Sequence, residues 1–175
     1  MFPSQLQRRK ETMVAITQKE FRQLAAFIKS NYGIHLKEEK KTLVTGRLQN
    51  ELAKNNFNSF SEYFEYILSD KSGNAVATLI EKITTNHTFF MRESNHFFYF
   101  RDKVLPYLKK TITDKDLRVW SAGCSTGEEP YTLAMIIDEF FGKEKVFWDT
   151  KVLATDISKR VLEEAQIGIY SNEDI

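Results

Sequence analysis

Two glycines and two glutamates lie in one short loop of this chain, and together they suit a cationic ligand. An apolar run with strand character leads into the loop, which contains Gly123 and Gly127, and a helical pattern follows it. Glycine lets a ligand approach the backbone closely, and a helix N-terminus offers free N–H groups. Glu128 and Glu129 at the exit of the loop would repel a phosphate and attract a positive charge.

A further carboxylate lies at the end of the next apolar run. Asp156 follows the second predicted strand, and the carboxyl ends of parallel strands face the ligand crevice of an open α/β sheet. A carboxylate at that position can accept hydrogen bonds from both ribose hydroxyls of a nucleoside. We therefore expect the glycine loop and Asp156 to form parts of one nucleoside site.

The spacing of Gly123, Gly127 and Asp156 limits the kinds of nucleoside ligand that the site could bind. Asp156 follows Gly127 at a longer distance than the roughly 20 residues of a dinucleotide fingerprint. Gly123 and Gly127 give G-x-x-x-G rather than G-x-G-x-x-G, and no Gly-Lys-Ser/Thr follows as in a phosphate loop. A positively charged nucleoside without phosphate fits best, and S-adenosyl-L-methionine has that chemistry. An ordinary tight turn between a strand and a helix remains the alternative.

Composition excludes several partners and cofactors. The net charge of +1 gives no global field for nucleic acid or a membrane, while 42% hydrophobic residues support a real core. Cys124 is the only cysteine, which fits a reducing compartment, so we expect a cytoplasmic protein with Cys124 as a packing residue. The three histidines lack metal-ligand spacing, and we expect no metal. No signal segment or membrane-spanning run is evident.

The first half of the chain is predicted to be a bundle of four short helices. Capping boxes at Thr17–Glu20 and Ser59–Glu62 begin two of them, and a second helix is expected over 37–54. Apolar residues then recur at helical spacing. Those expected on the core side are Phe21, Leu24, Ala25, Ile28, Val44, Leu48, Leu52, Phe64, Ile67, Leu68, Val76, Leu79, Ile80 and Ile83.

The pattern changes at Thr84, which divides the chain into an all-α domain, residues 1–84, and an α/β domain, residues 85–175. A helix carrying Phe97 to Leu108 is expected to be kinked or restarted at Pro106. The elements expected after it are strands at 117–121 and 151–155 and helices at 129–141 and from Ser158. Strand–helix–strand–helix is the opening of a parallel, Rossmann-like sheet.

Several motifs, in order along nearly the whole chain, resemble those of the CheR-type chemotaxis receptor methyltransferases. They are Asn86–Glu93, His96–Phe97, Arg118–Ala122, Ser125–Tyr131, Ala154–Ile157 and Ala165–Tyr170. The resemblance implies a helical N-terminal domain followed by a class I methyltransferase domain. It also implies methyl transfer from S-adenosyl-L-methionine to glutamates of methyl-accepting chemotaxis receptors, giving glutamate methyl esters and S-adenosyl-L-homocysteine.

The resemblance also implies roles for particular residues. Glu129 matches an acidic cofactor contact, Asp156 matches the ribose-binding carboxylate, and Arg92 is the expected catalytic residue that orients the substrate carboxylate. The residues expected to bind the cofactor are Asn86, Thr88, Arg92, Gly123, Glu129 and Asp156.

Ordinary structural roles remain as alternatives for residues in these motifs. Asn86 and Thr88 would be helix caps, and Arg92 and Glu93 a surface ion pair. Glu128 is expected to interact with a helix dipole rather than with a ligand. The phenylalanines are expected in the core rather than on the cofactor: Phe89, Phe90, Phe97 and Phe100.

A basic stripe on the second helix is the expected receptor-binding surface. Lys40, Arg47 and Lys54 recur every seven residues, and in the family basic residues of this helix face acidic receptor helices. Glu51 interrupts the stripe, so a solvated helix face is the alternative.

Only two strands are predicted, far fewer than a class I methyltransferase sheet contains. We therefore expect a fragment that binds cofactor weakly or not at all, and whose exposed strand edge and face lead it to associate with another copy. Three other functions remain open: a non-catalytic receptor-binding module with a vestigial methyltransferase half, methylation of a protein other than a chemoreceptor, and a nucleotide-dependent oxidoreductase, which lacks its glycine fingerprint.

Overall fold

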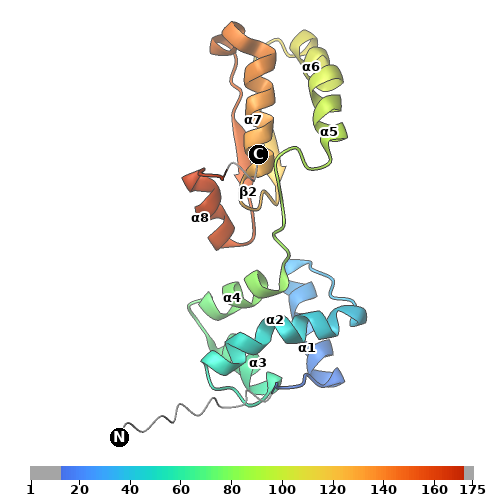
Figure 1. Ribbon diagram of the computed structural model, residues 1–175, viewed down its shortest axis with the longest axis vertical. Coiled ribbons are helices and arrows are strands. Elements are labelled where there is room, and N and C mark those ends of the chain that lie inside the picture. Colours follow the sequence, from blue (N-terminus) through green and yellow to red (C-terminus); the bar gives the residue numbers. More distant parts are fainter. Residues whose placement is uncertain (1–12, 172–175) are drawn as a thin grey trace, which may run out of the picture. The chain divides into compact units, whose positions relative to one another are not determined.

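The chain divides into two units, Met1–Ile83 and Thr84–Ile175, and each has an apolar core of its own. The computed structural model describes residues 13–171 (Figure 1). The first unit is built from helices, and the second combines helices with a pair of strands. The predicted fold class, an all-α part followed by the start of a parallel α/β sheet, is confirmed.

The first unit is a helical bundle around one apolar core. Its elements are α1 (Gln18–Tyr32), the 3-10 turn η1 (Glu38–Lys40), α2 (Lys41–Lys54), α3 (Phe60–Ser69) and α4 (Asn74–Ile83). Each helix presents one apolar stripe to the others, and burial of these stripes stabilises the bundle. Residues buried in this core include Phe21, Leu24, Ile28, Val44, Leu48, Leu52, Tyr63, Leu79 and Ile80.

The helix ends of the bundle follow the sequence pattern with one difference. At α1 the Thr17 hydroxyl accepts the Glu20 N–H and the Glu20 carboxylate accepts the Thr17 N–H, so this capping box is confirmed. At α3 the Ser59 hydroxyl accepts the Glu62 N–H at 3.1 Å. The Glu62 carboxylate, however, accepts the N–H of Asn58 at 2.8 Å, so the predicted second capping box forms only in part.

The buried face of α3 also differs from the prediction. Phe60, Tyr63 and Ile67 are buried, whereas Leu68 is 58% exposed. Each residue turns a helix by about 100°, so Leu68 lies one step beyond the stripe that these three residues form. Phe64, which was predicted in the core, is partly buried at the edge of the stripe.

The second unit begins with helices and continues into the strand–helix–strand–helix segment. Its elements are α5 (Ser94–Tyr99), the π-helical turn η2 (Phe100–Val104), α6 (Leu105–Thr111), β1 (Val119–Ala122), α7 (Glu128–Phe141), the 3-10 turn η3 (Gly142–Phe147), β2 (Val152–Thr155) and α8 (Lys159–Ile167). Its core gathers residues of α5 to α7, with Val119 and Val152 packed against them.

Pro106 acts at the start of α6 rather than in the middle of a helix. It occupies the first turn of α6, where its missing N–H costs little. The preceding turn is π-helical, and the Leu105 N–H bonds to the Phe100 carbonyl five residues earlier. The predicted restart at Pro106 is therefore confirmed, and the wider π turn joins the two helices.

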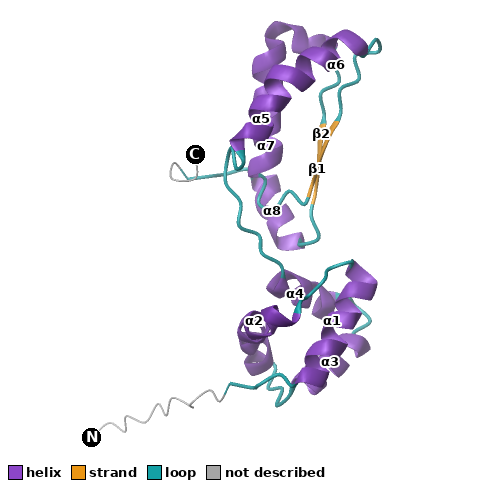
Figure 2. Ribbon diagram, turned by 90° about the vertical axis from the view of Figure 1, so that its right-hand side faces the viewer, coloured by secondary structure: helices purple, strands orange, loops and turns teal. Residues whose placement is uncertain are grey.

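The two strands pair in parallel and are covered on one face. Val119 pairs with Val152 and Ala122 with Thr155, so both strands begin later than predicted. Alternate residues point toward α7, as the strand period requires. On the other face Trp120 is 66% and Leu153 59% exposed, and Figure 2 shows the described helices of this unit on one side of the strands.

No helix within residues 13–171 is both long enough and apolar enough to cross a membrane.

Candidate functional site

A cleft of about 460 Å³ lies at the carboxyl ends of β1 and β2, within the second unit. Its volume is in the range of small-molecule sites. All six predicted cofactor residues line it: Asn86, Thr88, Arg92, Gly123, Glu129 and Asp156. Its other lining residues are Thr85, His87, Phe89, Glu93, His96, Phe97, Phe100, Val119, Trp120, Cys124, Ser125 and Leu133.

The backbone amides of the glycine loop bond within the protein. The Gly123 and Cys124 N–H groups both donate to the Thr155 carbonyl, at 2.7 and 2.9 Å. The Gly127 N–H donates to the Cys124 carbonyl at 3.0 Å. These three N–H groups are therefore used inside the protein and are not free for a ligand. Because these three amides donate to carbonyl groups of the protein, they do not contribute to an anion nest of the kind that binds phosphate.

Asp156 joins the end of β2 to that loop. Its Oδ2 accepts the Ser125 N–H at 2.8 Å, and its Oδ1 accepts the Ser158 N–H at 2.9 Å. Each carboxylate oxygen can accept more than one hydrogen bond, so the group can also serve ribose hydroxyls. Ser158 precedes α8 as predicted, but its hydroxyl makes no capping bond.

The two glutamates after the loop have different environments. Glu129 lines the cleft, and its Oε1 accepts a 2.6 Å bond from the hydroxyl of Ser121, which is buried on β1. Glu128 is itself buried, and both its oxygens accept the Thr126 hydroxyl, at 2.9 and 2.7 Å. The hydrogen bond from Ser121 thus orients Glu129 at the cleft. Glu128 instead lies buried in the first turn of α7, where it bonds to Thr126.

The Asn86–Glu93 segment, which precedes α5, forms the wall of the cleft opposite the glycine loop, and part of its backbone is strained. Met91 and Glu93, on either side of Arg92, have left-handed φ angles of 58° and 56°. Such residues cost roughly 1–2 kcal/mol each and cluster at functional sites. The Arg92 side chain is exposed, and its Nη1 donates to the His87 carbonyl at 2.7 Å. This bond holds the guanidinium group on the wall of the cleft.

The structural alternatives for this segment are not formed. Arg92 bonds to a backbone carbonyl, and Glu93 pairs with His96 at 3.3 Å rather than with Arg92. Asn86 and Thr88 precede α5 by several residues and do not cap it. The Asn86 carbonyl accepts the Ser125 hydroxyl at 2.7 Å, so the segment is bonded directly to the glycine loop.

Cys124 is a buried packing residue of the loop. It is 1% exposed, and its Sγ donates to the Ser125 carbonyl at 3.6 Å. Burial raises the pKa of the thiol, and the Asp156 carboxylate adds to this effect. The thiol therefore stays protonated near neutral pH and is not a nucleophile. Among the described residues, no group of three or more His, Cys, Asp or Glu side chains is placed to hold a metal ion.

Aromatic side chains on the cleft were missed from the sequence. Trp120 points away from the covered face of β1 and lines the cleft, and its Nε1 donates to Thr155 Oγ1 at 3.0 Å. Phe89, which was expected in the core, is 46% exposed and also lines the cleft. The alternation of side chains along a strand could have placed Trp120 on the face opposite to the buried Ser121. Phe89 lies in an irregular segment, where no helix or strand periodicity indicates the direction of its side chain.

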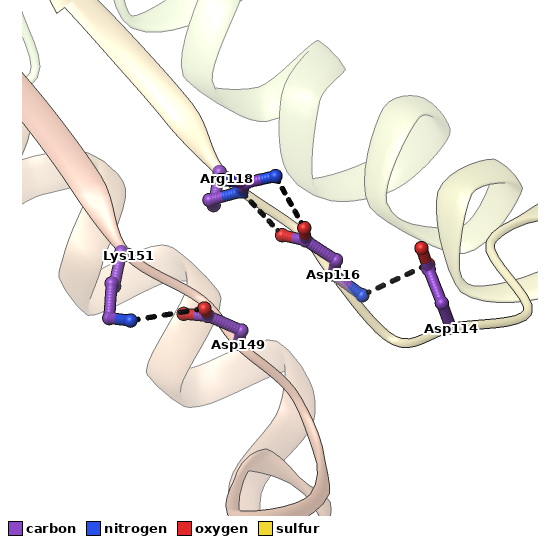
Figure 3. A network of polar contacts seen from close by, with 5 residues as sticks. All are labelled: Asp114, Asp116, Arg118, Asp149 and Lys151. Atoms are coloured by element: carbon purple, nitrogen blue, oxygen red, sulfur yellow. Dashed lines mark hydrogen bonds and ion pairs between the residues drawn. The ribbon is translucent and has the colours of Figure 1, made fainter.

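The opposite ends of the strands carry a separate polar network, which Figure 3 shows. Arg118 pairs with Asp116, its Nε lying 2.6 Å from Oδ1, just before β1. Lys151 pairs with Asp149 at 3.1 Å before β2. These ion pairs lie at the amino ends of parallel strands, away from the cleft at their carboxyl ends, and they are largely exposed.

The predicted receptor-binding residues belong to the first unit. Lys40 and Lys54 are exposed, in η1 and at the end of α2. Arg47 is half-buried, and its Nη1 donates to the Ile83 carbonyl at the end of α4, at 3.0 Å. Arg47 therefore supports the bundle itself, whereas the two lysines extend into solvent.

Comparison with known proteins gives two family matches. The family described as CheR methyltransferase, SAM binding domain, matches residues 86–175, and CheR methyltransferase, all-alpha domain, matches residues 19–84. A protein of Borreliella burgdorferi named chemotaxis protein methyltransferase is 42% identical over 93% of this chain and 58% of its own length. The Escherichia coli protein of that name is 34% identical over 93% of this chain and 54% of its own. The chain thus spans about half the length of the curated relatives it matches.

Proposed function

Because the chain belongs to the CheR methyltransferase family, we propose that its cleft binds S-adenosyl-L-methionine and that the complete enzyme methylates glutamate side chains of chemotaxis receptors. The observation that carries this proposal is the cleft itself. The glycine loop, the Asn86–Glu93 segment and Asp156 are far apart in the sequence, yet all of them line it.

The chemistry of the cleft suits this ligand. Asp156 and Glu129 place two carboxylates on its wall, and the N–H groups of Gly123, Cys124 and Gly127 are bonded within the protein rather than free for a phosphate. Trp120 and Phe89 add aromatic surface for a planar base. In our proposal Asp156 accepts the ribose hydroxyls, Glu129 attracts the positively charged part of the ligand, and Asn86, Thr88 and Gly123 complete the contact surface.

Methyl transfer to a carboxylate needs little acid–base catalysis. When bound, S-adenosyl-L-methionine supplies a methyl group activated by its sulfonium. A glutamate side chain with a pKa near about 4.3 is already ionised at neutral pH and can act as the nucleophile. The protein then contributes orientation and exclusion of water. Arg92, held at the cleft by the His87 carbonyl, is our candidate for orienting the incoming carboxylate.

Receptor recognition is proposed for the first unit. Lys40 and Lys54 are exposed cations near the two ends of α2, where they can contact an acidic helical surface. Charged groups at such a surface mainly affect the rate of encounter and the choice of partner. The proposal that a chemotaxis receptor is the partner rests on family membership. The proposal of a cytoplasmic location rests on it too.

The direct test uses the complete enzyme, purified and titrated with S-adenosyl-L-methionine by calorimetry, then incubated with receptor cytoplasmic domains. We expect saturable binding at one site and a gain of methyl groups at receptor glutamates, detected by mass spectrometry. Failure to bind the methyl donor would refute the proposal. Receptor binding without methyl transfer would instead support the non-catalytic module.

A further inference from the structure

Two tyrosines, Tyr131 and Tyr170, pack against the backbone of glycines near the loop, and neither of them lines the cleft. A Cβ atom placed on Gly127 would lie 2.5 Å from the Tyr170 hydroxyl, and one on Gly168 would lie 2.6 Å from the Tyr131 hydroxyl. Each hydroxyl therefore occupies the space that a side chain on the opposite glycine would need. Gly127 also has a φ of 105°, which other residues rarely adopt. The end of α8, with Ala165, and the residues that follow it thus pack directly onto the backbone of the loop.

The Tyr170 hydroxyl fixes one peptide group of that loop. It donates to the Thr126 carbonyl at 2.7 Å. The N–H of the same peptide, which belongs to Gly127, donates to the Cys124 carbonyl at 3.0 Å. Both polar ends of the peptide are bonded, so its plane cannot rotate without losing a hydrogen bond. Burial raises the pKa of Tyr170 to about 12, so the hydroxyl stays protonated well above neutral pH.

The Tyr170 ring connects other parts of the site. It packs edge-to-face against Phe90, with 4.9 Å between ring centroids, and against Tyr131 at 5.7 Å. Phe90 belongs to the segment that forms the opposite wall of the cleft, and Tyr131 lies in the first turn of α7. One side chain that does not line the cleft therefore contacts three elements that shape it.

We propose that Tyr170 is a positioning residue that sets the affinity for the methyl donor by holding the Thr126–Gly127 peptide in place. This inference rests on the proposed function of the cleft. Tyr170 acts through the loop and does not touch the ligand. Simple packing of the ring is the competing explanation, and the variant Tyr170→Phe separates the two because it keeps the ring and removes the hydroxyl.

The first experiment needs no ligand and measures amide hydrogen exchange at Gly127 by NMR in the ligand-free protein. In Tyr170→Phe we expect exchange at Gly127 to accelerate about tenfold while exchange in the bundle is unchanged. The matched control is Tyr131→Phe, which removes a hydroxyl bonded to the Ala165 carbonyl at 3.0 Å and should leave Gly127 exchange within about twofold of wild type. Exchange at Gly127 that is unaltered in Tyr170→Phe would overturn the proposal.

The second experiment measures steady-state kinetics of the complete enzyme. Loss of one hydrogen bond predicts a KM for S-adenosyl-L-methionine that rises about three- to tenfold in Tyr170→Phe, with kcat and the KM for receptor unchanged. Partial unfolding would lower kcat and leave the KM unchanged, which would contradict a positioning role. A wild-type enzyme without methyl transfer would refute the proposed function, whereas the Gly127 exchange rates would still decide whether Tyr170 anchors the loop.

Discussion

The Asp156 Oδ2 accepts the Ser125 N–H at 2.8 Å, and this bond fastens the glycine loop to the end of β2. The same carboxylate bonds to the Ser158 N–H through its other oxygen, at 2.9 Å. Two loops that follow different strands are thus held by one charged group. The carboxylate thus holds this part of the cleft together, and in the proposed function it also accepts the ribose hydroxyls of the ligand.

Replacement of Asp156 by Asn should therefore weaken binding of the methyl donor. Hydrogen bonds to a charged acceptor contribute roughly 1.5–3 kcal/mol each, which corresponds to about a 10- to 100-fold loss of affinity. Calorimetry on the complete enzyme measures this loss. Asp116→Asn is the matched control, because Asp116 pairs with Arg118 at the other end of β1 and should leave the affinity unchanged. Wild-type affinity in Asp156→Asn would contradict its assignment.

Arg92→Ala should lower kcat strongly, by about tenfold or more, because a group that orients the attacking carboxylate contributes to positioning. The guanidinium bonds to the His87 carbonyl, so the local wall of the cleft also loses one contact. Receptor methylation under saturating methyl donor is the measurement. Arg101→Ala removes an exposed arginine that pairs with Asp102 and should keep wild-type turnover. Near-normal methylation by Arg92→Ala would remove this residue from the mechanism.

Charge reversal at Lys54 should weaken receptor binding while it spares binding of the methyl donor. Lys54 is exposed at the end of α2, so the substitution alters a surface charge without disturbing the core. We expect slower association that depends on ionic strength, measured by surface plasmon resonance. Lys71→Glu, in the exposed loop before α4, is the control. Arg47 is less suitable because its bond to the Ile83 carbonyl supports the bundle.

The bundle should lose stability in acid partly through Glu20. Burial alone would raise the pKa of Glu20, but hydrogen bonds from Thr17 and Ser61 outweigh it and hold the pKa below its ordinary value of 4.5. The Glu20 carboxylate therefore contributes fully to the free energy of unfolding when the pH is above its ordinary pKa. This contribution is lost as the pH falls through the lower pKa of the folded state. Thermal melts of Glu20→Gln should show a smaller fall in Tm below about pH 5 than wild type. Glu65→Gln, at an exposed site on α3, should melt like wild type across this range.

The 175-residue chain should associate with itself through the open strand face. Leu153 is 59% exposed on that face, and exposed apolar strands favour pairing between molecules. Light scattering should detect a species larger than a monomer, and Leu153→Lys should shift it toward the monomer. Met135→Lys, at a 56% exposed position on α7, tests whether any added charge has this effect. A strictly monomeric wild-type chain would contradict the expectation.

The sequence predicted the periodic parts of this fold well. The helix of Gln18–Tyr32 has a capping box, an apolar stripe and a terminal glycine, and all three act as expected. The buried face of α3 was partly wrong because Phe64 and Leu68 are as apolar as Phe60 and Tyr63, so composition alone could not select the stripe. The π turn at Phe100–Val104 has no periodic signal that distinguishes it from an ordinary helix.

The sequence predicted which residues form the candidate site but not the hydrogen bonds that they make. All six expected cofactor residues line one cleft, while the roles assigned to them stay predictions. The bonding of the Gly123 and Cys124 amides could not be foreseen, because their acceptor, the Thr155 carbonyl, is a backbone group that any residue would supply. Tyr170 was part of a recognised motif, yet its contact with Thr126 depends on how α8 returns to the loop.

The positions of the two tryptophans give this chain a built-in pair of optical reporters. Trp120 is 66% exposed on the wall of the cleft, whereas Trp148 packs against Phe141 with 4.7 Å between ring centroids. Indole emission shifts to shorter wavelength as water leaves the ring, so a ligand that covers Trp120 changes the red part of the spectrum. The emission of Trp148 instead follows the integrity of the second unit, and a single fluorescence titration can separate occupancy of the cleft from unfolding.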